Sequence, residues 1–190
     1  MFNLRAPSLC LFAVLAACGG DDDASTTKAD QTPPQGAKAL EAWLSTGIYK
    51  SWQCESAVHA SRDPSPHSFN RICSNDLISN NATSASAWPK GAAAVKELYA
   101  SADGKTPVGY AVYLKTDADS ADGKNWYWYE RVPPDALGGM FPDGMVADGM
   151  GSETTSNANK ICVGCHVAAG SDAAHTPSAH GRDEVYTPVM

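Results

Sequence analysis

GYAVYLKT, at residues 109–116, and NWYWYERV, at residues 125–132, are the two stretches that decide the fold. Successive side chains of an extended chain point to opposite faces, and in both stretches large apolar or aromatic residues recur at every second position. A third run of this kind covers residues 92–100, and polar connections at 101–105 and 117–124 separate the three. This pattern predicts an antiparallel sheet held by cross-strand aromatic pairs.

The flanking segments predict a few short helices around that sheet. Leu40, Trp43 and Leu44 have helical spacing in Ala37–Gly47, which ends at a glycine. Residues 156–169 also read as a short helix, whereas residues 133–151 are rich in Gly, Pro and Met and read as a loop. The long 3.6-residue periodicity of a four-helix bundle is missing from the middle of the chain. The expected fold class is therefore mainly β (α+β), an antiparallel β-sheet domain with a few helices.

Cys162-Val163-Gly164-Cys165-His166 lies within the predicted C-terminal helix and matches C-x-x-C-H, the attachment signature of c-type haem. Two thiols at this spacing can each add across a haem vinyl group, and His166 is then the proximal ligand of the iron. A thioredoxin-like redox pair would need a βαβ pattern, and a structural zinc site would need a second pair of ligands. The sequence shows neither context, so the motif predicts one covalently bound haem c.

The first residues predict export and a lipid anchor. Residues 1–17 combine one arginine with an apolar run too short to cross a bilayer, which is typical of a cleaved signal peptide. The run closes on LAACG, which looks like a bacterial lipobox that makes Cys18 the acylated first residue of the mature protein. The alternative is an ordinary cleavage site with an incidental cysteine. We expect the protein to be anchored at the periplasmic or outer-membrane face of a Gram-negative bacterium.

Composition divides the rest of the chain into a tether and one domain. Residues 18–36 are polar and carry almost no apolar side chains, so we expect a disordered tether. Residues 37–190 have the length of one domain built around a single core. The formal net charge of −7 argues against nucleic acid as a partner.

Cys54 and Cys73 remain once the signal peptide, the lipid anchor and the C-x-x-C-H motif have taken the other four cysteines. Two such thiols in an exported protein predict a disulfide. A thiolate ligand to haem, or a free reactive pair, is the alternative.

Several further elements, taken in their order along the chain, resemble the cytochrome P-460 family, whose relatives include the β-sheet form of cytochrome c-prime. These elements are Pro66-His67 with Arg71 and Asn75, Trp88-Pro89-Lys90-Gly91 before Val95-Lys96-Glu97, Gly109-Tyr110, the aromatic strand Trp126–Tyr129, the haem motif, and Asp183-Glu184-Val185-Tyr186. The resemblance implies a β domain, a homodimer and a five-coordinate haem with an open distal face. An iron with a vacant position can bind and transform small nitrogen ligands.

The resemblance also implies a choice between two activities. In the enzymatic branch a lysine is cross-linked to the haem and supports oxidation of hydroxylamine, whereas the cytochrome c-prime branch lacks the cross-link and binds nitric oxide. Lys96 is the candidate for this lysine, with Lys90 behind it, and a surface lysine paired with a carboxylate is the alternative. The partners expected are a small nitrogen ligand or substrate and a redox partner protein.

Other residues could serve the sixth position of the iron. Met140, Met145 or Met150 as sixth ligand would make the protein an electron carrier, and an open iron without turnover would make it a gas-binding protein. The methionines could equally be apolar contacts at the haem edge. His175 or His180 could also offer a distal ligand, with solvent exposure as the alternative. Candidates for polar groups that line the distal pocket or neutralise the propionates, each with an ordinary surface or loop role as the alternative, are Arg62, His67 and Arg71.

Overall fold

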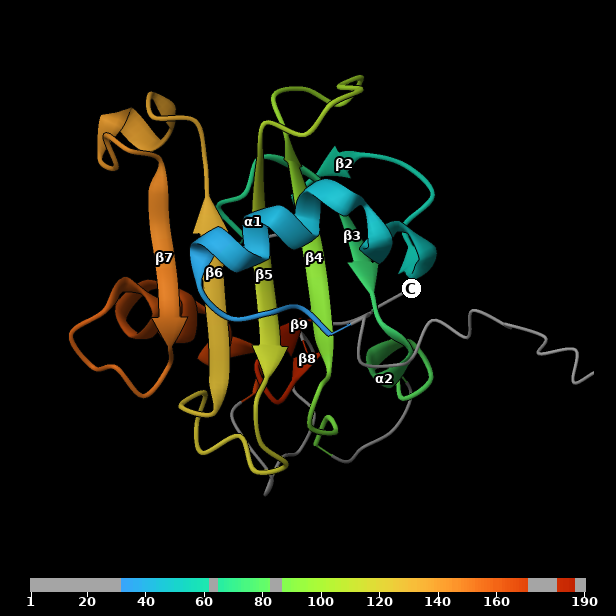
Figure 1. Ribbon diagram of the computed structural model, residues 1–190, viewed down its shortest axis with the longest axis vertical. Helices are drawn as coiled ribbons and strands as arrows, with labels where there is room; N and C mark the ends of the chain where they lie inside the picture. The colour runs from blue at the N-terminus through green and yellow to red at the C-terminus, as the bar shows by residue number, and fades with distance from the viewer. Residues whose placement is uncertain (1–31, 62–64, 83–86, 171–180, 187–190) are drawn as a thin grey trace, which may run out of the picture.

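A seven-stranded antiparallel sheet forms the centre of the computed structural model (Figure 1). The structure describes residues 32–61, 65–82, 87–170 and 181–186. The strands of the sheet are β1 (Gln53–Cys54), β2 (His59–Ala60), β3 (Phe69–Ser74), β4 (Ala93–Tyr99), β5 (Gly109–Lys115), β6 (Trp126–Arg131) and β7 (Met145–Met150). Their order is β1-β3-β4-β5-β6-β7, and β2 also pairs with β3. The predicted fold class, mainly antiparallel β with a few helices, is confirmed.

Short helical segments and a small hairpin surround the sheet. The hairpin consists of β8 (Gly181–Arg182) and β9 (Val185–Tyr186). The helical segments are α1 (Ala37–Thr46), η2 (Ile48–Ser51), α2 (Asp76–Ser79), η3 (Ala136–Gly139), the π-helical η4 (Ala158–Val163), α3 (Gly164–His166) and η5 (Val167–Ala169). Among the described residues, no helix combines the length and apolar character needed to cross a membrane.

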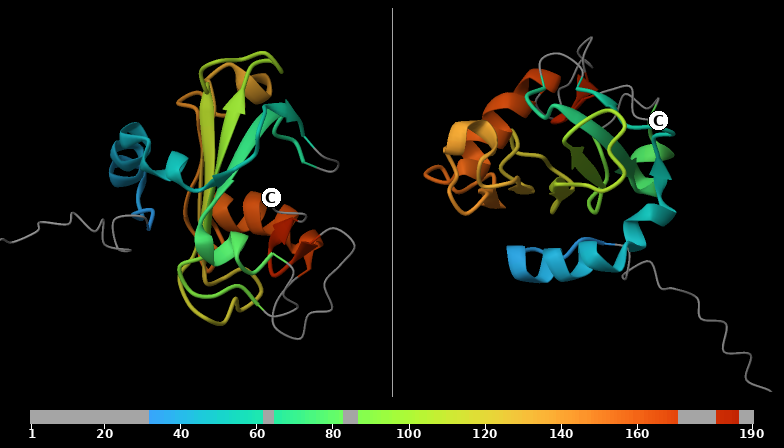
Figure 2. Two further views of the ribbon diagram at one scale, coloured as in Figure 1. Left: turned by 90° about the vertical axis from the view of Figure 1, so that its right-hand side faces the viewer. Right: turned by 90° about the horizontal axis from the view of Figure 1, so that it is seen from above.

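The two faces of the sheet carry separate cores. Helix α1 covers one face, and η4, α3 and the β8–β9 hairpin lie against the other (Figure 2). On the first face Leu40 and Leu44 of α1 pack with Val112 and Tyr129. On the second face Trp128 packs with side chains of the C-terminal segment. Because both faces are covered, all five residues from 126 to 130 are buried although their side chains alternate.

The helix predicted in Ala37–Gly47 and the three predicted strands are present, whereas the single short helix predicted for residues 156–169 is instead a succession of the three short segments η4, α3 and η5. Helix α1 ends at Gly47, which adopts the left-handed conformation with φ of 70° that glycine tolerates best. The end of the predicted tether belongs to the folded domain. Pro33 is buried, and the Gly36 amide donates a 3.0 Å hydrogen bond to the Tyr127 hydroxyl. Residues 1–31, which include the predicted signal peptide and Cys18, lie outside the described residues.

The prediction that residues 133–151 form a loop is wrong for their second half. Met145–Met150 is the edge strand β7, which pairs with β6. Gly144 precedes it with a φ of 75°, and a Cβ there would overlap the Val132 carbonyl oxygen, so the glycine belongs to a turn. Gly149 lies within the strand, directly opposite Trp128. The composition resembles a loop because β7 needs glycine at its entrance and again at Gly149, where a Cβ would lie 2.8 Å from the Glu153 carboxylate.

The predicted disulfide between Cys54 and Cys73 is present and joins β1 to β3. It encloses a segment with a sequence separation of 19 residues. Replacing both cysteines by alanine should lower the free energy of unfolding by about 3 kcal/mol, because the unfolded chain regains the entropy of the open loop. Urea unfolding of oxidised wild type and variant measures the difference. An unchanged midpoint of unfolding would contradict the prediction. Alkylation of the wild type without reductant should leave Cys54 and Cys73 unmodified.

Candidate functional site

A row of small and charged side chains crosses the centre of the second sheet face. Antiparallel register places Lys96 of β4 opposite Ala111 of β5, Ala111 opposite Glu130 of β6, and Glu130 opposite Ala147 of β7. Neighbouring strands lie about 4.8 Å apart, so two charged residues flank a single alanine at a separation of about 10 Å. Ala111 leaves room between these larger side chains and lines a cavity of this face.

The adjacent row is aromatic and contacts the C-x-x-C-H segment. Tyr113 and Trp128 are cross-strand partners on the same face of the sheet. The His166 ring centre lies 4.6 Å from that of Trp128 and 6.0 Å from that of Tyr113. Tyr186 of β9 stands 5.3 Å away and donates a hydrogen bond to the Cys165 carbonyl. The aromatic rings therefore hold His166 against the sheet.

Residues Ala158–His166 are helical and are anchored at their start. The Asn159 amide donates to the Ser156 hydroxyl, and the Asn159 side chain donates to the Gly151 carbonyl at 2.6 Å. Cys162 is buried and Cys165 is half-buried, and both thiols are free. Burial raises the pKa of Cys162 to about 12, which keeps it a thiol and disfavours a reactive redox pair.

His166 presents one defined ring nitrogen. Its Nδ1 lies 2.6 Å from the Glu184 carbonyl oxygen, and since a carbonyl can only accept, Nδ1 carries the proton. Burial, followed by the positive charge of Lys96, lowers the pKa of His166 to about 3. The neutral ring thus keeps a lone pair on Nε2, which is the state of a metal-binding histidine whose other nitrogen is held by a carbonyl.

The turn that carries Glu184 is held in place by a buried ion pair. Asp183 accepts hydrogen bonds from the Lys115 ammonium and the Trp88 amide, both at 2.7 Å, and from the Ser120 hydroxyl. Asp183 and Lys115 are completely buried. Because Glu184 follows directly, this network fixes the carbonyl that orients His166.

Two adjoining cavities open on this face. A small cavity of about 60 Å³ lies beside Cys162, Cys165 and His166, and Lys96 and Glu130 are also in its wall. A larger cavity of about 600 Å³ extends from it toward the loop at residues 133–141. Both are lined by Pro66, His67, Glu130 and Ile161. The larger volume is within the range of small-molecule and cofactor sites. The free thiols and the neutral histidine line the small cavity, and together with the adjoining larger, mainly apolar cavity they fit a covalently attached haem.

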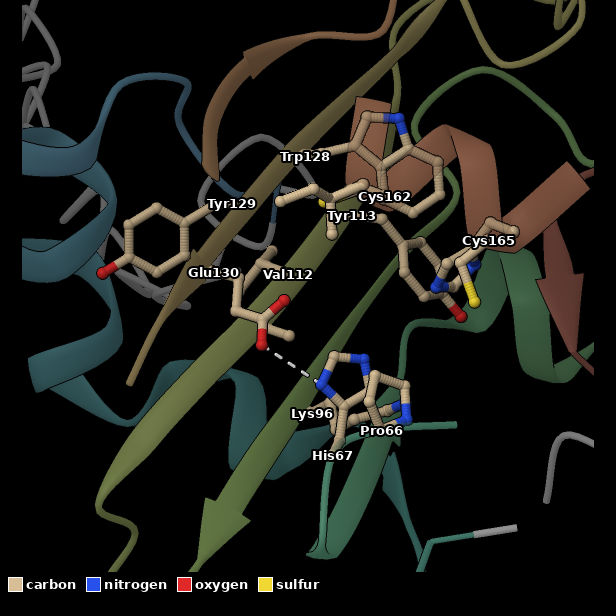
Figure 3. Close-up of a pocket in the computed structure, with 13 residues that line it drawn as sticks. Pro66, His67, Lys96, Val112, Tyr113, Trp128, Tyr129, Glu130, Cys162 and Cys165 are labelled. Atoms are coloured by element: carbon tan, nitrogen blue, oxygen red, sulfur yellow. Dashed lines mark ion pairs between the residues drawn. The ribbon is translucent and has the colours of Figure 1, made fainter. Parts of the chain in front are cut away.

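His67 and Glu130 face each other in the shared wall (Figure 3). The His67 Nδ1 lies 3.2 Å from the Glu130 Oε1. Their side chains are only 12% and 9% exposed, so the pair lies largely out of solvent. The close-up shows Lys96 and Pro66 beside His67, whereas Tyr129 extends to the other side of the sheet.

Some predicted residues are brought to this site and others are not. Lys96 lines the small cavity and Met140 lines the large one, whereas Lys90 is exposed elsewhere. Met145 and Met150 pack against the α1 core on the opposite face, so neither is placed to be a sixth ligand. Arg71 forms an ion pair with the buried Glu97, also on that opposite face. Arg62, His175 and His180 lie outside the described residues.

Glu130, Tyr113 and Glu184 were not singled out as site residues from the sequence. The alternation that places Glu130 on the same face as Trp128 was visible, but which face meets the C-x-x-C-H segment depends on tertiary packing. The contact of Glu184 is made by its backbone, which has no side-chain signal.

Within the described part of the chain, no group of three or more His, Cys, Asp or Glu is arranged to hold a metal ion.

Comparisons with known proteins identify no relative of this chain. No family model matches the chain, and no curated protein or solved structure shows significant similarity to it.

Proposed function

We propose that this protein is a mono-haem c-type cytochrome of the P-460 type that carries out redox chemistry on a small nitrogen species such as hydroxylamine or nitric oxide. The observation that carries the proposal is that Lys96 and the C-x-x-C-H segment, far apart in the sequence, line one cavity. Cys162 and Cys165 would hold the haem, and His166 would bind its iron through Nε2. When bound, the haem supplies an iron whose vacant position can accept a small nitrogen ligand.

The residues around the cavity suit this task in different ways. Trp128 and Tyr113 pack against His166 and exclude water from its ligand atom. The Glu184 carbonyl holds the orientation of the imidazole, and the Asp183 carboxylate holds the turn that carries Glu184. Oxidation of hydroxylamine releases electrons, which would pass to a redox partner protein. Cys18 would keep the domain at the membrane by its lipid anchor.

An absorption spectrum of protein made with c-type maturation machinery tests the proposal. The oxidised, dithionite-reduced and carbon monoxide-treated samples are compared. We expect covalent haem bands that change on addition of carbon monoxide, because the sixth position is open. Steady oxidation of hydroxylamine with an electron acceptor would support an enzyme over a gas-binding protein. Purified protein without haem would overturn the proposal.

An electron carrier with a methionine as sixth ligand is the second candidate function, and one observation supports it. Met140 lines the large cavity, although its side chain is 72% exposed and the adjacent glycines give it little support. This candidate would be favoured if the absorption bands of the wild type are sharp and do not change on addition of carbon monoxide, whereas those of Met140→Ala do change.

Substitution of Lys96 tests the proposed cross-link. The cross-link would join the Lys96 amine nitrogen to a carbon of the haem, and an oxidant such as a peroxide would take the two protons and two electrons that forming this bond releases. If the cross-link exists, the wild type has a broad, red-shifted ferrous Soret band and Lys96→Ala has ordinary c-type bands. Lys90→Ala is the matched control, because Lys90 is exposed and lines neither cavity. Identical spectra for wild type and Lys96→Ala would exclude the cross-link.

A further inference from the structure

Two histidine–glutamate pairs occur in the described part of the chain, and they differ in what the ring nitrogens meet. In His59, Nε2 lies 2.8 Å from the Glu55 carboxylate and Nδ1 lies 2.6 Å from the Ala60 carbonyl, so both nitrogens are engaged. In His67, Nδ1 is the nitrogen that faces the Glu130 carboxylate, at 3.2 Å. His67 lines both cavities, and His59 lines neither.

The pairing determines which proton His67 carries. The Glu130 carboxylate oxygen lies 3.2 Å from Nδ1 of His67, and its negative charge favours the tautomer that carries the proton on Nδ1 and the lone pair on Nε2. Glu130 is buried near the end of β6, in register with Ala111 of β5, which makes its carboxylate a fixed partner for this ring. A histidine oriented in this way by a carboxylate is equipped to accept a proton at its second nitrogen.

We propose that His67, oriented by Glu130, accepts the proton that a protic small ligand loses when it binds in this cavity. This inference rests on the proposed function, because the cavity is taken to contain the haem iron. In the step, the bond between hydrogen and the ligand breaks, its proton moves to Nε2 of His67, and the anion stays in the cavity. No electrons are transferred. The Glu130 carboxylate then stabilises the imidazolium, which is formed away from bulk water.

Hydrogen cyanide and carbon monoxide are a suitable pair of probes, because only the former must lose a proton when it binds. At neutral pH, we expect His67→Leu to slow the association of hydrogen cyanide with the ferric protein by about 100-fold, the lower end of the usual range for a general base. Glu130→Gln should slow it by about tenfold, because the amide no longer fixes the tautomer with a negative charge. The association of carbon monoxide with the ferrous protein should change little in both variants.

His59→Gln is the matched control and should leave both rates as in the wild type, because His59 lines neither cavity. His67→Gln replaces His67→Leu if the latter folds poorly, and it should show the same selective loss. If His67→Leu slows the association of hydrogen cyanide and of carbon monoxide equally, His67 only shapes the cavity and the inference is overturned. An unchanged rate of hydrogen cyanide association in His67→Leu would also overturn it. Protein that carries no haem would refute the proposed function itself, so the two failures are distinguishable.

Discussion

Replacing Cys162 and Cys165 together by alanine should abolish covalent retention of haem. Both thiols are free, both line the small cavity, and each would form one thioether to the macrocycle. Without them the haem would be held only through His166 and apolar contact, and denaturation should release it. The measurement is intact-protein mass spectrometry together with haem staining of a denaturing gel. We expect the haem mass and stain in the wild type and neither in the double variant.

The second cysteine pair provides the control for that experiment. Cys54→Ala/Cys73→Ala should retain the haem through denaturation, because the disulfide lies between β1 and β3 and outside the cavities. It should be less stable than the wild type but carry the same haem mass. Covalent haem in Cys162→Ala/Cys165→Ala would refute the assignment of the motif.

Substitution of Asp183 should have the largest effect on stability. Asp183→Asn removes the charge that neutralises Lys115 in a completely buried pair. Asparagine tolerates the left-handed φ of 46° at this position better than alanine would, so the variant tests the charge and not the backbone. An ammonium group left buried without a counter-charge costs about 3–5 kcal/mol. The free energy of unfolding, measured in urea, should fall by about this amount.

Two further variants show whether the effect comes from the charge. Asp117→Ala removes an exposed aspartate and should change the free energy of unfolding by less than about 0.5 kcal/mol. Lys115→Met combined with Asp183→Asn should recover much of the loss, since the uncompensated charge is gone. A single Asp183→Asn variant as stable as the wild type would contradict the prediction. Because Glu184 follows Asp183, we also expect the hydrogen bond between the His166 ring and the Glu184 carbonyl to be weaker in the single variant.

Much of the framework was predictable because its signals are local. The alternation in residues 109–116 and 125–132 corresponds to β5 and β6, and the helical spacing before Gly47 corresponds to α1. Strand β7 was missed because Gly144 belongs to the turn before it and Gly149 lies against the Glu153 side chain, and neither cause is part of the strand's own alternation. Strand β3 was not singled out, since its residues Phe69–Ser74 mix polar and apolar side chains without clear alternation.

The chemistry of the motif and the arrangement around it have different origins. The sequence by itself determined the spacing of Cys162, Cys165 and His166 and singled out Lys96, because covalent spacing and resemblance can be read along the chain. Only the tertiary structure decided that Lys96 and Glu130 flank Ala111 and that His67 pairs with Glu130. Strand register and loop placement are set by the burial of two whole sheet faces, so they depend on contacts between segments distant in sequence. The same reason explains why a charged residue such as Lys115 is buried where its local sequence predicts an ordinary strand.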